Sequence, residues 1–349
     1  MNTKKLLTEH CKLYPSLNVA DVFKFIYQSA FGCEHMVSSL ESAISRIEAE
    51  ASRLKDNGAP LIEKLDGDFS RINLKYLKSG LSTKTLGTLF FLSAKDCKKD
   101  FASLLEKINV VKSMAKEGLL PFSYGELVSE LKLWEEKGFP AVHHSASFRE
   151  KHSPSYRVIS NKFIPFLPLF CEIDKKLSVG KTVLSIEGGS ASGKSTLGMI
   201  LSEIYGATVF HTDDFFLQPQ MRTKERLEEI GGNLDRERFL LEVILPLSEN
   251  QSVFYKRFDC QSLKILPPVE IPPADFTVIE GSYSTHPYFS KYYSLSVFLQ
   301  IDEEKQRERI KKRNSPSLQK RFFTEWIPME NKYFEHFKIK EKCDFVIQV

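Results

Sequence analysis

The chain has 349 residues, which is long for one domain and sufficient for two, each with its own core. Its hydrophobic content of 42% and charged content of 27% are typical of a soluble globular protein, and no run approaches the roughly 18 apolar residues of a membrane helix. A net charge of +4 is too small at this length to support coating of nucleic acid. We therefore expect no nucleic-acid partner and no membrane partner.

The cysteines and the N-terminus indicate a cytoplasmic protein. Six cysteines are scattered without a CxxC pair, which argues against a zinc ribbon and against a secreted disulfide scaffold. The first residues lack the continuous apolar core of a signal peptide. The sequence is also compatible with assembly into a homo-oligomer.

The first half of the chain is predicted to be helical. Apolar residues from Val19 to Ala30 follow the spacing of one helix face, and Asn18 is placed to cap that helix. Ser123 and Glu126 match a capping box before a second helical segment, which ends at Gly138. Strand-like alternation is scarce before residue 180. We predict a mostly α-helical domain of unknown role over residues 1–170.

A group of cysteine and histidine residues stands out in this helical domain. Its members occur in two stretches and are Cys33, His35, His143, His144 and His152. Such residues could form a metal or catalytic cluster, but no pair has the tight spacing of a metal motif. The alternative is that they lie at helix ends and contact the backbone or the second domain. A substrate-sensing or acceptor-delivering module is the interpretation we favour for residues 1–170.

The second half of the chain alternates between short β-branched runs and helical patterns. This alternation is typical of parallel strands joined by crossover helices. The prolines at 165 and 168 lie near the boundary between the two patterns. We predict an α/β domain over residues 171–349, with a P-loop NTPase parallel sheet and flanking helices.

A phosphate-binding loop is encoded by "GGSASGKST", which fits the Walker A pattern G-x-x-x-x-G-K-[ST]. Glycines let successive backbone N–H groups turn inward onto phosphate oxygens, and the helix that follows directs its positive end at the same anion. The pattern predicts ATP bound with Mg²⁺, with the lysine at the β- and γ-phosphates and the first hydroxyl at the metal. The predicted nucleotide-binding residues are Gly188, Gly189, Ser190, Ala191, Ser192, Gly193, Lys194, Ser195 and Thr196.

Other classes of P-loop protein lack support. A guanine-binding Asn-Lys-x-Asp motif, a DxxG switch and an LSGGQ-type signature are all missing from the sequence.

An acidic pair, Asp213 and Asp214, follows the next predicted strand, where residues line the ligand crevice of a parallel sheet. One carboxylate there can accept the proton of an alcohol that attacks the γ-phosphate. The alternative is a solvated turn with an Asp cap.

The segment from about Lys181 to Val349 resembles the uridine kinase family, within the wider group that includes pantothenate kinase and phosphoribulokinase. The resemblance is carried by an ordered set of motifs: "GGSASGKST", "DDFF", "NLDRERF", "RFDC" and "TVIEGSY", followed by an Arg-rich segment. The resemblance implies that Asp213 is the general base and that Asp235 binds hydroxyls of the acceptor. It also implies that Glu280 and Ser195 serve Mg²⁺. Asp214 could equally hold the metal through water, and spacing alone does not rank the two aspartates.

An Arg-rich lid is the further implication of the resemblance. Arg309 and Arg313 lie four residues apart, hence on one helix face, and match lid positions of the family. In a phosphoryl-transfer enzyme such cations neutralise charge on the γ-oxygens, so Lys194, Arg309 and Arg313 join Asp213 as predicted catalytic residues. The alternative is a solvated helix and loop.

The acceptor pocket departs from the family pattern. The family's base-recognising histidine falls near Leu263, and Phe216 and Phe258 replace its tyrosines. We keep Phe258 as a predicted substrate-binding residue, beside Asp213 and Asp235. The expected function is transfer of the γ-phosphate of ATP to an alcohol of a small molecule, with a nucleoside as the first candidate. The alternatives are a kinase of a sugar or small hydroxy acid, and a nucleotide-sensing protein whose helical domain is the effector.

Overall fold

The computed structural model describes residues 2–33, 36–54, 58–260 and 262–349. The chain divides into two compact units, Met1–Asp174 and Lys175–Val349. The sequence placed this division after residue 170, and the helix α8 (Leu167–Val179) runs through both positions. In the part of the chain that is described, no helix is both long enough and apolar enough to cross a membrane.

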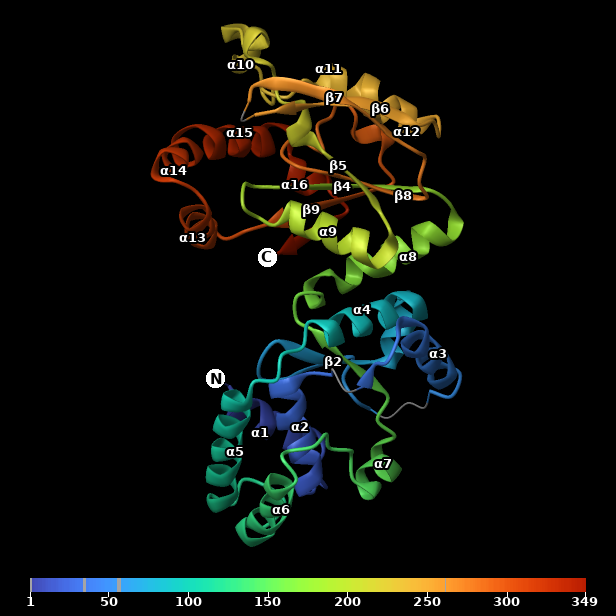
Figure 1. The fold of residues 1–349 in the computed structure, drawn as a ribbon, viewed down its shortest axis with the longest axis vertical. Helices are drawn as coiled ribbons and strands as arrows, with labels where there is room; N and C mark the ends of the chain where they lie inside the picture. Colours follow the sequence, from blue (N-terminus) through green and yellow to red (C-terminus); the bar gives the residue numbers. More distant parts are fainter. Residues whose placement is uncertain (1, 34–35, 55–57, 261) are drawn as a thin grey trace. The chain divides into compact units, whose positions relative to one another are not determined.

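The N-terminal unit is mostly helical, as predicted (Figure 1). Its helices are α1 (Thr3–Leu13), α2 (Val19–Phe31), α3 (Leu40–Ala51), α4 (Thr83–Lys95), α5 (Phe101–Lys116), α6 (Tyr124–Glu136) and α7 (Ala146–His152). Two of them begin at the predicted caps. The Asn18 side chain accepts the N–H of Asp21 at 3.3 Å, and that of Ser123 accepts the N–H of Glu126 at 3.2 Å. Both acids bond back to the cap N–H, so both starts are capping boxes.

A small antiparallel sheet in this unit was not predicted. Its order is β1 (Ile62–Lys64), β2 (Phe69–Asn73) and β3 (Tyr156–Ser160). The middle strand β2 is buried along its whole length, although it carries Ser70, Arg71 and Asn73. Polar side chains on a strand buried on both faces break the alternation of apolar and polar residues that identifies strands in a sequence.

The C-terminal unit contains the predicted parallel sheet, with strand order β10-β9-β4-β8-β5. The strands are β4 (Thr182–Gly188), β5 (Thr208–His211), β8 (Phe276–Glu280), β9 (Leu295–Gln300) and β10 (Phe345–Gln348). The central strand β4 is almost entirely buried, and α9 (Lys194–Tyr205) follows it and covers one face of the sheet (Figure 1). All carboxyl ends lie along one edge, where a ligand crevice forms in such sheets.

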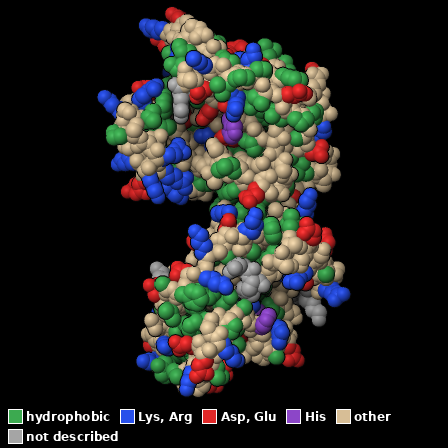
Figure 2. Space-filling view, viewed as in Figure 1, with side chains coloured by type: hydrophobic (Ala, Val, Ile, Leu, Met, Phe, Trp, Pro, Cys, Tyr) green, Lys and Arg blue, Asp and Glu red, His purple; other side chains and the backbone are tan. Residues whose placement is uncertain are grey.

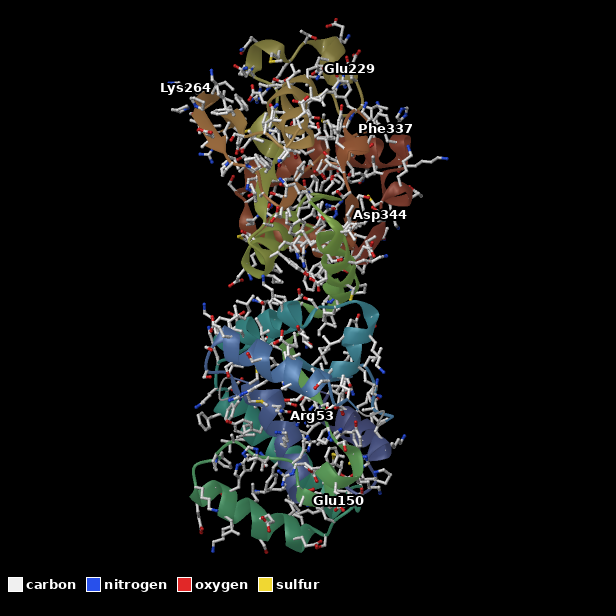
Figure 3. All side chains as sticks on the ribbon, turned by 90° about the vertical axis from the view of Figure 1, so that its right-hand side faces the viewer. Arg53, Glu150, Glu229, Lys264, Phe337 and Asp344 are labelled. Atoms are coloured by element: carbon white, nitrogen blue, oxygen red, sulfur yellow. The ribbon has the colours of Figure 1, made fainter. Side chains whose placement is uncertain are left out.

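The other face of the sheet is covered by a second layer. It contains the antiparallel hairpin of β6 (Val253–Asp259) and β7 (Lys264–Ile271), with the short helices α11 (Arg236–Phe239) and α12 (Leu245–Ser248) (Figure 1). Aromatic side chains fill the space between these layers, including Phe210, Phe215, Phe239 and Tyr255. A further short helix, α10 (Lys224–Glu228), precedes α11. Figure 3 labels Lys264, the first residue of the second hairpin strand.

The predicted lid segment forms two helical pieces. The first is α13 (Glu303–Arg313), which Asp302 caps through the N–H groups of Glu304 and Lys305. The second piece contains α14 (Pro316–Arg321) and α15 (Ile327–Phe337), joined by a π-helical turn at Phe322–Trp326. The short α16 (Ile339–Lys342) then leads into β10. Such π-helical turns are frequent at functional sites.

Candidate nucleotide and acceptor site

The Walker A residues form a tight loop between β4 and α9. Gly188 has φ 148°, Ala191 has φ 61° and Gly193 has φ 99°, so three loop residues lie at positive φ. A Cβ atom on Gly188 would lie 2.5 Å from the carbonyl oxygen of Leu299 on the neighbouring strand β9. Glycine at 188 is therefore required both by its φ and by this close approach.

The lysine of the loop is buried and turned back onto it. Lys194 begins α9, and its Nζ donates to the carbonyl oxygens of Gly188 at 2.7 Å and Gly189 at 3.2 Å. Ser195 and Thr196 are exposed in the same first helical turn. A parallel sheet whose central strand leads into such a loop and then a helix is the arrangement of P-loop nucleotide-binding proteins.

Substituting Gly188 with alanine is expected to destabilise the C-terminal unit by about 1–3 kcal/mol, because the new methyl group collides with the Leu299 carbonyl. Thermal unfolding of the full-length variant would measure this loss. Gly180→Ala is the matched control, since no described atom lies within 4 Å of a Cβ there. Equal unfolding midpoints for the two variants would contradict the packing described for the loop.

A cavity of about 930 Å³ opens beside the loop. The predicted site residues Ser190, Asp213, Asp214 and Phe258 line it, as does Leu263. Aromatic side chains supply much of the wall, and they are Phe216, Phe258, Tyr283, Phe322 and Trp326. The cavity has the size of a small-molecule site and the mixture of apolar walls and convergent polar groups that such sites show.

The acidic pair occupies the turn after β5, and its members face different charges. Asp213 is exposed to the cavity, yet the surrounding protein desolvates it and raises the pKa of its carboxyl, with partial compensation by Lys194. Burial also raises the pKa of Asp214, opposed by the positive charges of His211 and Arg257. The structure thus associates Asp213 with the loop lysine and Asp214 with the hairpin.

Glu280 lies at the end of β8, level with Ile186 of β4 and His211 of β5. Its buried carboxylate contacts Nδ1 of His211, and this hydrogen bond raises the pKa of the histidine. A Cβ atom on Gly198 of α9 would lie 3.6 Å from Cγ of Glu280, so the carboxylate flanks the helix that carries Ser195. The described residues contain no group of three His, Cys, Asp or Glu side chains arranged to hold a metal alone.

Asp235 has different surroundings from those expected. Asp235 is 5% exposed and caps α11, where it accepts the N–H of Arg238 at 3.2 Å and the Arg238 Nε–H at 3.2 Å. The structure does not place Asp235 on the cavity wall, where Asn233 lies instead. An aspartate that caps a helix has its carboxylate directed into the helix start.

The two predicted lid arginines lie in different surroundings. Arg309 donates to the carbonyl oxygen of Ala191 at 3.0 Å, and Gln306 from the same helix donates to that of Ser190 at 2.8 Å. Arg313 is exposed at the end of α13. Lys and Arg side chains gather over this helix in Figure 2. The structure therefore brings Arg309 to the loop and leaves Arg313 at the surface.

Sequence reasoning missed Glu330, which the structure places against the Walker A loop. This residue of α15 is 4% exposed. Its carboxylate accepts the N–H of Ser190 at 2.8 Å, the Ser190 hydroxyl at 2.7 Å and the Ser282 hydroxyl at 2.9 Å. Nothing in the surrounding helical pattern distinguishes Glu330, so its role emerges only from the fold.

A second carboxylate lies on the other side of the loop. Glu187 is fully buried and accepts the N–H of Gly188 at 3.0 Å and the hydroxyl of Tyr333 at 3.3 Å. Burial raises the pKa of Glu187 to about 7, although the charge of Lys194 opposes the shift. Tyr333 lies one helical turn after Glu330, so α15 is bonded both to Ser190 of the loop and to Glu187 of β4. Figure 3 labels Phe337 at the end of this helix.

Among the described residues, the predicted group of Cys33, His143, His144 and His152 does not form a cluster that could hold a metal ion. Cys33 is buried, and its Sγ donates to the carbonyl oxygen of Val158 at 3.3 Å. His143 is exposed, His144 is buried, and His152 packs on the rings of Tyr14 and Phe148. His35 lies outside the described residues.

Comparison with known proteins finds similarity only at the level of solved structures, over about half of the chain. No family model matches the chain, and no curated protein matches it. A structure of a possible uridine kinase from Bacillus stearothermophilus is 21% identical over 50% of this chain and 98% of that one, with a TM-score of 0.39. A protein assigned as a fructose transport system kinase from Silicibacter sp. TM1040 is 19% identical over 48% and 89% of the two chains, with a TM-score of 0.41. Both of these solved structures are described as kinases, and each match covers about half of this chain.

Proposed function

We propose that the C-terminal unit transfers the γ-phosphate of ATP to an alcohol group of a small molecule. The observation that carries this proposal is the position of Asp213, on the wall of a cavity of about 930 Å³ that opens beside a Walker A loop. An ATPase that only senses nucleotide needs no such cavity, whereas an acceptor must enter one.

In this proposal each residue has a distinct task. The loop amides of 188–196 and Lys194 would bind the triphosphate, and Ser195 with Glu280 would hold Mg²⁺, whose charge would neutralise that of the phosphate oxygens. One or two carboxylates together with substrate phosphates are a common coordination of Mg²⁺ in proteins, and Glu280 would be such a carboxylate. Asp213 accepts the proton of the attacking hydroxyl, and Arg309 supports the loop from α13.

The acceptor is a small alcohol, with a nucleoside as the first candidate. The wall contains Leu263 and Leu266 next to Phe258. Aliphatic side chains cannot hydrogen-bond a pyrimidine ring, so we infer that an acceptor is held here by stacking and apolar contact more than by reading its base edges. A sugar or a small hydroxy acid is the alternative acceptor.

A panel of nucleosides, pentoses, pantothenate and glycerate tests the proposed function. ADP formation by the full-length protein would be measured with Mg²⁺-ATP and each compound in turn. Stimulation by one compound is the expected result. Turnover that is equal for all compounds, and equal to turnover with none, would refute the transferase and favour a nucleotide sensor.

Glu330→Gln is expected to increase the affinity for Mg²⁺-ATP by roughly tenfold, about 1.4 kcal/mol. The glutamine retains the shape of the side chain and can still accept the Ser190 N–H, but it removes a negative charge from the phosphate-binding loop. Isothermal titration calorimetry would measure the change. Glu335→Gln, an exposed position on the same helix, is the control. Weaker binding by Glu330→Gln would show that the carboxylate assists the nucleotide instead of opposing it.

A further inference from the structure

The N-terminal unit contains a network of buried polar side chains that the proposed kinase activity does not use. The network joins α2 to β2 and β3 and includes the loop before α7. Two of its members, His144 and Tyr156, come from the His-rich stretch between residues 142 and 157. Buried polar networks are costly unless every member is satisfied, so the partners of each atom are informative.

A relay of hydrogen bonds positions the hydroxyl of Tyr156. Asp21 accepts the N–H of Ser145 at 3.0 Å and the Ser145 hydroxyl at 2.7 Å, and it lies 3.0 Å from Nδ1 of His144. Burial lowers the pKa of His144 to about 4, so the ring is neutral near pH 7. Its Nδ1 therefore carries the proton that faces Asp21, and its Nε2 accepts the Tyr156 hydroxyl at 2.8 Å.

A buried arginine lies beside this tyrosine. Arg71 is 2% exposed, and its guanidinium carbon lies 4.7 Å from the centre of the Tyr156 ring. Its Nη1 donates to Glu63 at 3.0 Å and its Nε donates to Gln28 at 2.9 Å. Glu63 is also held by Nδ1 of the buried His10. The guanidinium is thus fixed on two of its three nitrogen atoms.

The third nitrogen of Arg71 is buried, and the residue lines a cavity. Within the described part of the chain, no acceptor lies within hydrogen-bond distance of Nη2. Arg71 lines a cavity of about 20 Å³ together with Tyr14, Phe148, Tyr156 and its own ion-pair partner Glu63. The Nε2 amide of Gln28 is also without an acceptor among the described residues. Of these two buried donors, Arg71 Nη2 belongs to a residue that lines the cavity, so an oxygen bound there could serve as its acceptor.

The energetics favour occupancy of this cavity. A buried donor without a partner costs about 1–3 kcal/mol, and more when the group is charged. A water molecule needs roughly 10–15 Å³, so the cavity accommodates only the terminal atoms of a ligand. Guanidinium groups bind carboxylate and phosphate oxygens most strongly because these hydrogen bonds are charge-assisted. The rings of Tyr14 and Phe148 would contact the apolar part of such a molecule.

We propose that the N-terminal unit binds the carboxylate or phosphate group of a small molecule in this cavity, with Arg71 Nη2 as the principal donor. Tyr156 is a positioning residue: its ring lies against the guanidinium, and the Asp21–His144 pair fixes its hydroxyl. The site lies wholly within Met1–Asp174 and does not depend on the function proposed for the C-terminal unit.

Hydrogen–deuterium exchange with mass spectrometry tests this site in the full-length protein. A Lys194→Ala background weakens phosphate binding at the Walker A loop, so that exchange changes report the N-terminal unit. The probes are inorganic phosphate, acetate, and acetamide as the neutral match for acetate. We expect acetate or phosphate to slow exchange in peptides that contain residues 63–73 and 144–157, while acetamide has no effect.

Arg71→Lys keeps the positive charge but removes Nη2, and we expect it to weaken the apparent affinity for the active probe at least tenfold. Circular dichroism would establish whether this variant folds. If it does not fold, the proposal is judged only by the exchange changes that the probes cause in the Lys194→Ala protein. Unchanged exchange in both peptides, equal protection by acetamide, or undiminished binding by a folded Arg71→Lys variant would each overturn the proposal. Unchanged exchange would mean that the probes do not bind there, equal protection by acetamide that the site does not select an anion, and undiminished binding by Arg71→Lys that Nη2 is not the principal donor.

Discussion

Asp213→Asn should abolish phosphorylation of the acceptor while leaving Mg²⁺-ATP binding almost unchanged. The amide matches the shape of the carboxylate but cannot take a proton, and loss of a general base lowers rates by about 10²–10⁴-fold. Turnover and ATP affinity would be measured side by side, by ADP formation and by calorimetry. Asp214→Asn is the matched control and should lose less, because the charges around Asp214 are those of His211 and Arg257 and not that of the loop lysine. A larger loss in Asp214→Asn would reassign the base to Asp214.

The pH dependence of the reaction gives the same residue a second test. The base must be ionised to accept a proton. Turnover is therefore low at pH values below the pKa of Asp213 and rises as the pH passes through that pKa. Burial raises this pKa, so the acid limb of the wild-type profile should lie above pH 4, where an ordinary aspartate titrates. Any residual activity of Asp213→Asn should show no such limb. A wild-type acid limb at the ordinary value would contradict the burial described for this carboxyl.

Lys194→Ala is expected to have the second large effect, a loss of about 10²–10³-fold in kcat/KM for ATP. The ammonium group is the positive charge that the Walker A loop supplies to the phosphates, and such preorganised charge is worth this much in comparable sites. The substitution also leaves the carbonyl oxygens of Gly188 and Gly189 without their donor. Steady-state kinetics with varied ATP would measure the loss.

Lys340→Ala, at an exposed position of α16, controls for the general effect of removing a positive charge. It should leave kcat/KM for ATP within twofold of wild type. Full activity in a folded Lys194→Ala protein would contradict a role of the loop in turnover. The loop would then have only a structural role.

The C-terminal architecture could be predicted because its signals are local. The glycines, lysine and hydroxyls of 188–196 must be contiguous to form a loop, and short β-branched runs between helical patterns indicate a parallel sheet. Asp213 could be predicted for the same reason, since it directly follows a strand. These features need no knowledge of long-range contacts.

The features that escaped prediction depend on contacts between distant segments. Glu330 reaches Ser190 across 140 positions, and no periodicity or motif marks it as more than a helix residue. The burial of β2 hides Arg71, whose guanidinium pairs with residues from α2 and β1. Asp235 is a different kind of error. The motif match pointed to its segment, but the structure shows that its carboxylate caps the start of α11.

Phosphorus NMR of a reaction with the most stimulating alcohol tests the central claim most directly. If the loop holds ATP and Asp213 primes an acceptor in the adjoining cavity, a phosphate monoester must accumulate in equal amount to ADP, and neither should form with Asp213→Asn. Release of inorganic phosphate in place of the ester, at a rate that no alcohol alters, would contradict the account.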